Sequence, residues 1–170
     1  MNSRVLANLI IGIDGSTTLN HRSAGLSFPE DRLRFHNLRS QSDVIVIGGN
    51  SARNEPYATT PIPLIVLSHA DQIPKEIIAN TQVSLWNKNI TDALSDVKKI
   101  YSHILIEAGP SLLGPALKAG LIDELHICIS NKSGGESQIS LEEFTIGYTQ
   151  IKREEVEGGV FITYIPAPTE

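Results

Sequence analysis

Three short segments of the sequence carry small and polar residues of the kind that bind phosphate. They are Gly48-Gly49-Asn50-Ser51, Ser68-His69 and Glu107-Ala108-Gly109-Pro110-Ser111-Leu112. Each follows directly on an apolar run with the length and composition of a buried strand. In the third segment the strand passes straight into a predicted helix, so free backbone N–H groups and the positive helix end converge there. Such a turn can bind a pyrophosphate, although turn geometry alone also explains glycine at this place.

The elements that would position these segments are strands that alternate with helices. We expect strands over Val5–Ile13, Val44–Ile47, Leu64–Leu67, Val83–Trp86 and Ile104–Ile106, and helices over Phe28–Arg39, Asn89–Lys99 and Pro110–Ala119. After Gly120 the pattern changes to consecutive strands, Leu125–Ser130 and the segments on either side of the hairpin signal Gly158-Gly159. This order predicts a three-layer α/β/α fold with a mixed, mainly parallel sheet and an antiparallel C-terminal edge. In such sheets, ligands bind at the carboxyl ends of the strands.

The helix predicted over Phe28–Arg39 has recognisable ends and a partial apolar face. Ser27 and Glu30 form the pattern of a capping box, which makes Ser27 the expected N-cap. The apolar face comprises Leu33, Phe35 and Leu38. Arg39 lies in the last turn, where a cation complements the helix dipole.

Composition restricts the classes of function. The chain has 170 residues, 41% of them hydrophobic and 5% aromatic, which predicts one domain spanning 1–170 with an aliphatic core. A net charge of -5 argues against nucleic acid as a partner, and no apolar run reaches the length of a membrane span, so we expect a cytoplasmic protein. Cys128 is expected to be a buried small hydrophobe. No metal site is indicated, because no metal-ligand spacing relates the five histidines, His21, His36, His69, His103 and His126.

Further motifs occur in a fixed order along almost the whole chain. They are Gly12-Ile13-Asp14-Gly15-Ser16, the stretches Ser27–Arg32 and Phe35–Gly48, Asn54-Glu55-Pro56, Ile104–Leu112, Leu121–Leu125 and Glu157–Phe161. With these motifs the sequence resembles the reductase domain of the riboflavin biosynthesis deaminase/reductase family, which shares the dihydrofolate-reductase-like fold. The resemblance implies a pyrimidine reductase that uses NADPH and acts on a small molecule.

The resemblance implies that NADPH lies across the strand ends. Gly48, Gly49, Asn50 and Ser51 would approach its pyrophosphate and adenosine, and Ser68 its 2′-phosphate region. Ala108, Gly109, Pro110, Ser111 and Leu112 would offer backbone donors to the pyrophosphate. Arg53 is either a cation for the 2′-phosphate, because a guanidinium matches phosphate oxygens, or a solvated loop residue.

The substrate positions of the family fall on Asp14, Ser16, Ser27, Arg39, Glu55 and Glu107. We expect Glu107 to act in catalysis, because a carboxylate that ends a buried strand is costly without a hydrogen-bonding partner. Asp14 would bind substrate or relay a proton, and is equally explained as an ordinary turn residue. Ser27 and Arg39 can combine ligand binding with their roles at the ends of the helix.

Three positions depart from the family pattern. Ser16 stands where the family usually has Lys, and Asn54-Glu55-Pro56-Tyr57 replaces an Asp-Asp-Pro sequence that a Leu-Thr-x-Arg stretch follows. The lost Lys and Arg would grip a ribose 5-phosphate through charge-assisted hydrogen bonds. Ala108 replaces a glycine, which predicts strain if this position requires a positive φ.

These observations leave three functions open. The first is a reductase resembling 5-amino-6-(5-phosphoribosylamino)uracil reductase, which transfers a hydride to the ribosyl carbon of the pyrimidine. The second is a reductase of a different, unphosphorylated heterocycle. The third is a catalytically degenerate, nucleotide-binding homodimer. A homodimer is implied by the resemblance in every case, and Leu121–Ile129 is the apolar surface that we expect the second copy to cover.

Overall fold

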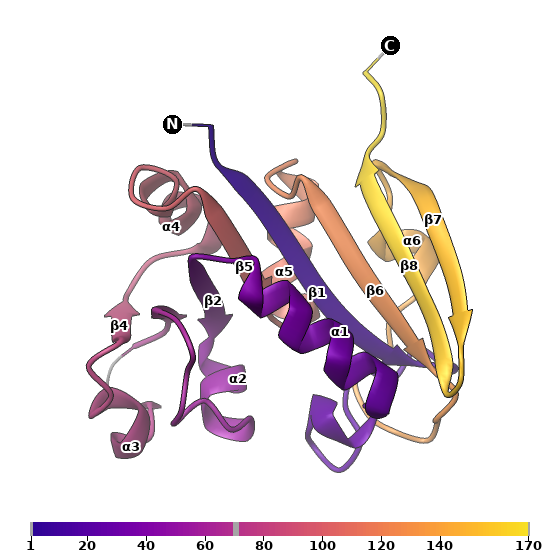
Figure 1. Ribbon diagram of the computed structural model, residues 1–170, viewed down its shortest axis with the longest axis horizontal. Coiled ribbons are helices and arrows are strands. Elements are labelled where there is room, and N and C mark those ends of the chain that lie inside the picture. Colours follow the sequence, from indigo (N-terminus) through magenta and orange to yellow (C-terminus); the bar gives the residue numbers. More distant parts are fainter. Residues whose placement is uncertain (1, 70–71, 170) are drawn as a thin grey trace.

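The computed structural model describes residues 2–69 and 72–169 and is built around one eight-stranded sheet (Figure 1). The strand order is β4-β3-β2-β5-β1-β6-β8-β7. The strands are β1 (Arg4–Gly12), β2 (Val44–Gly48), β3 (Leu64–Leu67), β4 (Val83–Trp86), β5 (His103–Glu107), β6 (Glu124–Ser130), β7 (Tyr148–Val156) and β8 (Gly159–Pro166). The strands β1 to β6 pair in parallel, while β8 is antiparallel to both β6 and β7. The predicted mixed sheet with an antiparallel C-terminal edge is therefore confirmed.

Helices cover both faces of the sheet. They are α1 (Pro29–Ser40), α2 (Gly49–Asn54), α3 (Lys75–Ile78), α4 (Ile90–Val97), α5 (Pro110–Lys118) and α6 (Leu141–Phe144), with a 3-10 turn at Ser23–Gly25. Buried side chains of α1, α2 and α3 pack in one core cluster, and those of α4 and α5 pack in the other. Figure 1 shows α1 in front of the sheet and α4 and α5 behind it. This arrangement confirms the three-layer α/β/α prediction.

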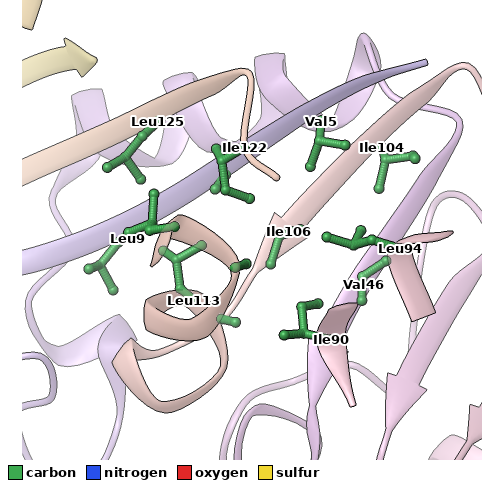
Figure 2. Packing of buried hydrophobic residues seen from close by; sticks show 14 of the residues in the cluster. Val5, Leu9, Val46, Ile90, Leu94, Ile104, Ile106, Leu113, Ile122 and Leu125 are labelled. Carbon is green, nitrogen blue, oxygen red and sulfur yellow. The ribbon is translucent and has the colours of Figure 1, made fainter. Parts of the chain in front are cut away.

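The two clusters follow from the alternation of side chains along each strand. On β5, Ile104 and Ile106 face α4 and α5, whereas Leu105 faces the opposite layer. Figure 2 shows Leu94 of α4 and Leu113 of α5 reaching into the cluster that contains Ile104 and Ile106, and both side chains are fully buried. Burial of a Leu or Ile side chain contributes roughly 1.5–3 kcal/mol relative to exposure, so this packing fixes the position of both helices.

The start of α1 differs from the prediction. Phe28 is the N-cap, and Ser27 caps nothing, because its hydroxyl donates to the Asp31 carboxylate at 2.5 Å. Pro29 explains the shift, since proline favours the first helical position and holds the preceding residue extended. The predicted apolar face is also incomplete, because Leu33 is 72% exposed while Leu38 is buried.

The surface predicted for dimerisation is wrong. The strand β6 lies between β1 and β8, and Leu125, Ile127 and Cys128 within it are fully buried. Their burial confirms Cys128 as a core residue, and it removes Leu121–Ile129 as an exposed edge. The two edges of the sheet are β4 and β7. Within the described ranges, no helix is both long and apolar enough to cross a membrane.

The strand register brings the chemically interesting turns together. Gly48 at the end of β2 pairs with Leu67 at the end of β3, and β2 also pairs with β5. The segments that follow these three strands therefore lie side by side at the carboxyl ends of the parallel strands. The strands β1 and β6 extend further, because β1 is level with Glu107 at Asn8 and continues to Gly12.

Candidate active site

A groove of about 270 Å³ opens at the ends of β2, β3 and β4. Four of the residues predicted to bind the cofactor, Gly49, Asn50, Arg53 and Ser68, lie together in it. Its lining residues are Gly49, Asn50, Arg53, Leu67, Ser68, His69, Gln72, Asn87 and Lys88. Arg53 and Lys88 give the groove two cations in a chain whose net charge is negative.

The side chains of Ser68 and Arg53 approach the start of α2 closely at Gly49. A β-carbon at Gly49 would lie 2.6 Å from the Ser68 hydroxyl and 3.0 Å from Nη1 of Arg53. No side chain fits there without moving both groups. The absence of a side chain therefore lets a hydroxyl and a guanidinium converge on one backbone position.

The turn between β5 and α5 is open towards solvent. Gly109 is the N-cap of α5, Pro110 lies in the first turn, and a β-carbon at Gly109 would meet no atom within 4 Å. The turn after β2 is its neighbour, because a β-carbon at Gly48 would lie 3.6 Å from Cδ2 of Leu112. Ala108 is buried and is not among the residues with a positive φ, so the predicted strain at this alanine is absent.

Glu107 is buried and held by two side chains. Its Oε1 accepts a hydrogen bond from Nε of Arg39 at 2.7 Å, and its Oε2 accepts one from Nη2 of Arg39 at 2.8 Å. The hydroxyl of Tyr57 donates to the same Oε2 at 2.5 Å. The side chain of Glu107 is 4% exposed and that of Arg39 is 13% exposed. Arg39 thus neutralises a buried carboxylate through a bidentate ion pair. This role comes in addition to the position at the helix end that the sequence predicted.

Electrostatics favour the charged form of Arg39 and the neutral form of Tyr57. Burial lowers the pKa of Arg39, but the hydrogen bonds and charge of Glu107 outweigh it and raise the pKa above its ordinary value. Burial, reinforced by the charge of Glu107, raises the pKa of Tyr57 well above 10. The guanidinium of Arg39 also lies 4.2 Å from the ring centroid of Phe35 and 5.4 Å from that of Tyr57. Tyr57 is therefore a neutral donor and Arg39 a fixed cation.

Asp14 lies in a turn between β1 and the 3-10 turn. Its Oδ1 accepts from the backbone N–H and hydroxyl of Ser16, and its Oδ2 accepts from the backbone N–H of Gly134 and from Gln138. The backbone N–H of Gly134, followed by the Ser16 hydrogen bonds, holds the pKa of Asp14 far below its usual range. An ionised acceptor of this kind does not relay protons near neutral pH, although it can accept a hydrogen bond.

The other predicted substrate residues are also paired within the protein. Ser16 is fully buried, and its hydroxyl, bound to Asp14, also accepts from the backbone N–H of Gly135. Oε1 of Glu55 accepts from the backbone N–H of Ser23 at 2.6 Å and from its hydroxyl at 2.7 Å. Ser27 is bound to Asp31. Each of these side chains therefore already makes at least one hydrogen bond within the protein.

Sequence reasoning missed Tyr57 and Lys88. Nothing in the local sequence links Tyr57 to Glu107, which lies 50 residues away. Lys88 could have been identified, because it comes only two residues after the predicted strand Val83–Trp86. Within the ranges 2–69 and 72–169, no cluster of His, Cys, Asp and Glu suits a metal ion.

Comparison with known proteins identifies the family. The model of the RibD C-terminal domain matches residues 3–157. The chain belongs to the RibD C-terminal domain family. The resemblance inferred from the motifs is thereby confirmed, and the relatives of the chain include enzymes named as pyrimidine reductases, which are oxidoreductases.

Individual relatives agree with the RibD assignment. A 2,5-diamino-6-ribosylamino-4(3H)-pyrimidinone 5′-phosphate reductase from Methanothermobacter thermautotrophicus is 23% identical, with 76% of this chain and 78% of the relative covered. A pyrimidine reductase-like protein from Corynebacterium diphtheriae superposes with a TM-score of 0.76 at 22% identity, covering 98% and 93% of the two chains. Dihydrofolate reductase from Enterococcus faecalis, solved with NADP(H), gives 0.70 at 12% identity, covering 97% of each chain. These structures establish a dihydrofolate-reductase-like fold.

Proposed function

We propose that the protein is an NADPH-dependent reductase of riboflavin biosynthesis that reduces the ribosyl carbon of a phosphoribosylaminopyrimidine. The observation that carries the proposal is that two features lie close together at the carboxyl ends of the parallel strands. One is the row of small-residue turns after β2, β3 and β5, which leaves hydrogen-bond donors accessible. The other is the buried Glu107–Arg39 pair, which lies at the end of β5 directly before the turn into α5.

The residues at the strand ends fit a dinucleotide. A β-carbon at Gly109, the N-cap of α5, would meet no atom within 4 Å, so a phosphate would have room to approach the backbone N–H groups that begin the helix. Gly49 brings Ser68 and Arg53 to a second polar position. When bound, NADPH supplies the hydride, and the protein supplies binding and orientation.

The residues of the chain would then bind the cofactor and orient the substrate. The amides of Ser111 and Leu112 would bind the pyrophosphate, and Arg53 and Ser68 would bind the 2′-phosphate. The carboxylate of Glu107, fixed by Arg39 and Tyr57, would orient polar groups of the substrate in a site that is already organised. Asp14 would act as a permanently ionised acceptor, and its four hydrogen bonds hold the loops that follow β1 and β6 together.

One specific observation favours a second candidate, a reductase of an unphosphorylated substrate. The cation expected after the Asp14-Gly15 turn is replaced by Ser16, whose hydroxyl is buried between Asp14 and Gly135. A phosphate dianion would lose a charge-assisted hydrogen bond at this position, and such bonds contribute roughly 1.5–3 kcal/mol.

Turnover with a matched pair of substrates tests the proposal. NADPH oxidation is followed with 5-amino-6-(5-phosphoribosylamino)uracil and with the same compound lacking the phosphate. We expect the phosphorylated compound to be reduced with the higher kcat/KM. Preference for the dephosphorylated compound would support the second candidate. Binding of NADPH without reduction of either compound would support the degenerate, nucleotide-binding alternative and overturn the proposed activity.

The family resemblance also supports a cytoplasmic homodimer. Because β6 is internal, we infer that a second copy uses another surface, and β4 and β7 are the two edge strands of the sheet. Light scattering at micromolar concentration would give twice the monomer mass if the dimer forms, and the monomer mass would contradict it.

A further inference from the structure

We propose that Phe35 of α1 is a positioning residue for the reaction. Its ring restrains the guanidinium of Arg39, and Arg39 in turn fixes the direction in which the carboxylate of Glu107 faces the substrate. The inference deepens the proposed function and rests on it. It assigns a role in orienting the substrate to a side chain that acts through Arg39 and not by touching the substrate itself.

Phe35 does not serve as a core residue. The sequence predicts it on the apolar face of the helix together with Leu38, but only Leu38 is buried, whereas Phe35 is half-buried. Among the described residues, neither core cluster includes Phe35. Its ring lies instead against two guanidinium groups of the same helix, with Cζ of Arg39 at 4.2 Å and Cζ of Arg32 at 5.3 Å from the ring centroid. These are the surroundings of a cation–π contact.

The helix brings Phe35 and Arg39 together. Residues four apart on an α-helix lie on the same face, so the ring of Phe35 is beside the guanidinium of Arg39. The ring of Tyr57 lies 5.4 Å from the same guanidinium. The N–H donors that bind Glu107 lie in the plane of the guanidinium, whereas an aromatic ring packs on its face. The carboxylate and the ring therefore restrain different motions of Arg39.

The orientation of Arg39 determines the orientation of the Glu107 carboxylate, because a bidentate pair has a defined geometry. Among the described residues, the donors to Glu107 are Nε and Nη2 of Arg39 and the hydroxyl of Tyr57, and two of these three use Oε2. A carboxylate can accept about four hydrogen bonds, so Oε1 keeps an acceptor position for a polar group of the substrate. A tilt of Arg39 would turn that position away, and small displacements of a bound substrate reduce the rate strongly.

A second arginine–phenylalanine contact on α1 provides a matched control. The Cζ of Arg34 lies 4.5 Å from the ring centroid of Phe161, which is half-buried in the same way as Phe35. Arg34 donates to the carbonyl oxygen of Ile127, and its Nη2 lies 2.8 Å from Nδ1 of His126, so Arg34 is held against β6. Removal of either ring deprives an arginine of α1 of a cation–π contact, but only the contact of Phe35 leads to Glu107.

Steady-state kinetics with NADPH and 5-amino-6-(5-phosphoribosylamino)uracil test the inference. Phe35→Leu keeps an apolar, helix-forming side chain but removes the aromatic face. We expect kcat/KM for the pyrimidine to fall about tenfold, the equivalent of one partly desolvated cation–π contact. The dissociation constant of NADPH, measured by calorimetry, should stay within about twofold of wild type. Phe35→Tyr restores the ring and should recover kcat/KM to within about twofold, and Phe161→Leu should leave it within the same range.

The outcomes separate this inference from the proposed function. An unchanged kcat/KM in Phe35→Leu, an equal fall in Phe161→Leu, or no recovery in Phe35→Tyr would overturn the role of Phe35 while leaving the reductase intact. A wild-type protein that does not reduce the pyrimidine would overturn the proposed function. Urea unfolding tests the contact itself in either case, because the effects of Phe35→Leu and Arg39→Met should not be additive. Additive effects would show that the ring does not restrain Arg39.

Discussion

The two halves of the candidate site are built in opposite ways. At the ends of β2, β3 and β5 the groups that would bind the cofactor are accessible, and Gly109 faces open space. At the predicted substrate positions the polar side chains already have partners within the protein. Glu107 is held by Arg39 and Tyr57, and Ser16 is held by Asp14.

This difference indicates where specificity arises. An open set of donors can accept a cofactor with little rearrangement, because the groups are already in place. A substrate that approaches Glu107 must use the directions that its partners leave free or displace one of them. The cofactor side should therefore tolerate small backbone changes, and the substrate side should lose stability when a single partner is removed.

The largest effect is expected from Arg39→Met. The change leaves the buried carboxylate of Glu107 without its cation, and loss of one partner of a buried ion pair costs about 3 kcal/mol or more. Urea unfolding measures the loss. Arg32→Met, on the exposed side of the same helix, is the control and should cost less than about 1 kcal/mol. Similar losses in the two variants would contradict a buried pair at Glu107.

A smaller loss is expected from Tyr57→Phe. The substitution keeps the buried ring and removes only the hydroxyl that donates to Oε2 of Glu107. A hydrogen bond to a charged group contributes about 1.5–3 kcal/mol, so we expect a loss of about 2 kcal/mol in unfolding free energy. NADPH affinity measured on the same preparation should stay unchanged. An unchanged stability would mean that Tyr57 and Glu107 are not coupled.

Substitutions at two glycines test whether the loop after β1, which carries Asp14, contacts the loop after β6. Gly15 and Gly134 have φ values of 86° and 83°, so alanine is strained at both. At Gly15 a β-carbon would also lie 2.3 Å from the carbonyl oxygen of Ile139, whereas at Gly134 it would meet no atom within 4 Å. Gly15→Ala should therefore lose about 1 kcal/mol more than Gly134→Ala in urea unfolding. Equal losses would show that the two loops are not in contact.

The smallest effect is expected on the cofactor side, from Ala108→Gly. Because Ala108 does not have a positive φ, restoring the glycine found in the family relieves no strain. The NADPH dissociation constants of the two proteins should agree within about twofold, or less than about 0.5 kcal/mol. Markedly tighter binding by the glycine variant would reveal a strain that the backbone angles do not show.

Local sequence signals predicted the elements well where they were strong. The bounds of Leu64–Leu67 and Val83–Trp86 agree with β3 and β4, because each is a short apolar run between polar or turn-forming residues. The helix predicted over Asn89–Lys99 is α4, although Asn89 is its N-cap and not part of it, because the Asn89 side chain accepts from the backbone N–H of Asp92. The six-residue α2 was missed, since Gly49 and Asn50 at its start are poor helix formers.

The arrangement within the site could not be predicted to the same extent. Ser16 and Gly135, or Tyr57 and Glu107, are far apart in sequence, and no local propensity records that they are hydrogen-bonded. Ser27 shows the same limit at short range, because its hydroxyl had two possible partners and Pro29 decided between them. The sequence predicted which positions lie at the strand ends. Tertiary packing determined which of their side chains already have hydrogen-bonding partners within the protein.

Nucleotide binding by Gly109→Val tests the central claim, that open backbone donors at the start of α5 bind the cofactor. A side chain at Gly109 meets no protein atom within 4 Å, so the variant should fold and lose no more than about 1 kcal/mol as an N-cap substitution. The added isopropyl group would stand over the helix amides, and we predict that calorimetry finds NADPH affinity reduced by at least about tenfold. A folded Gly109→Val protein that binds NADPH as tightly as wild type would contradict the account.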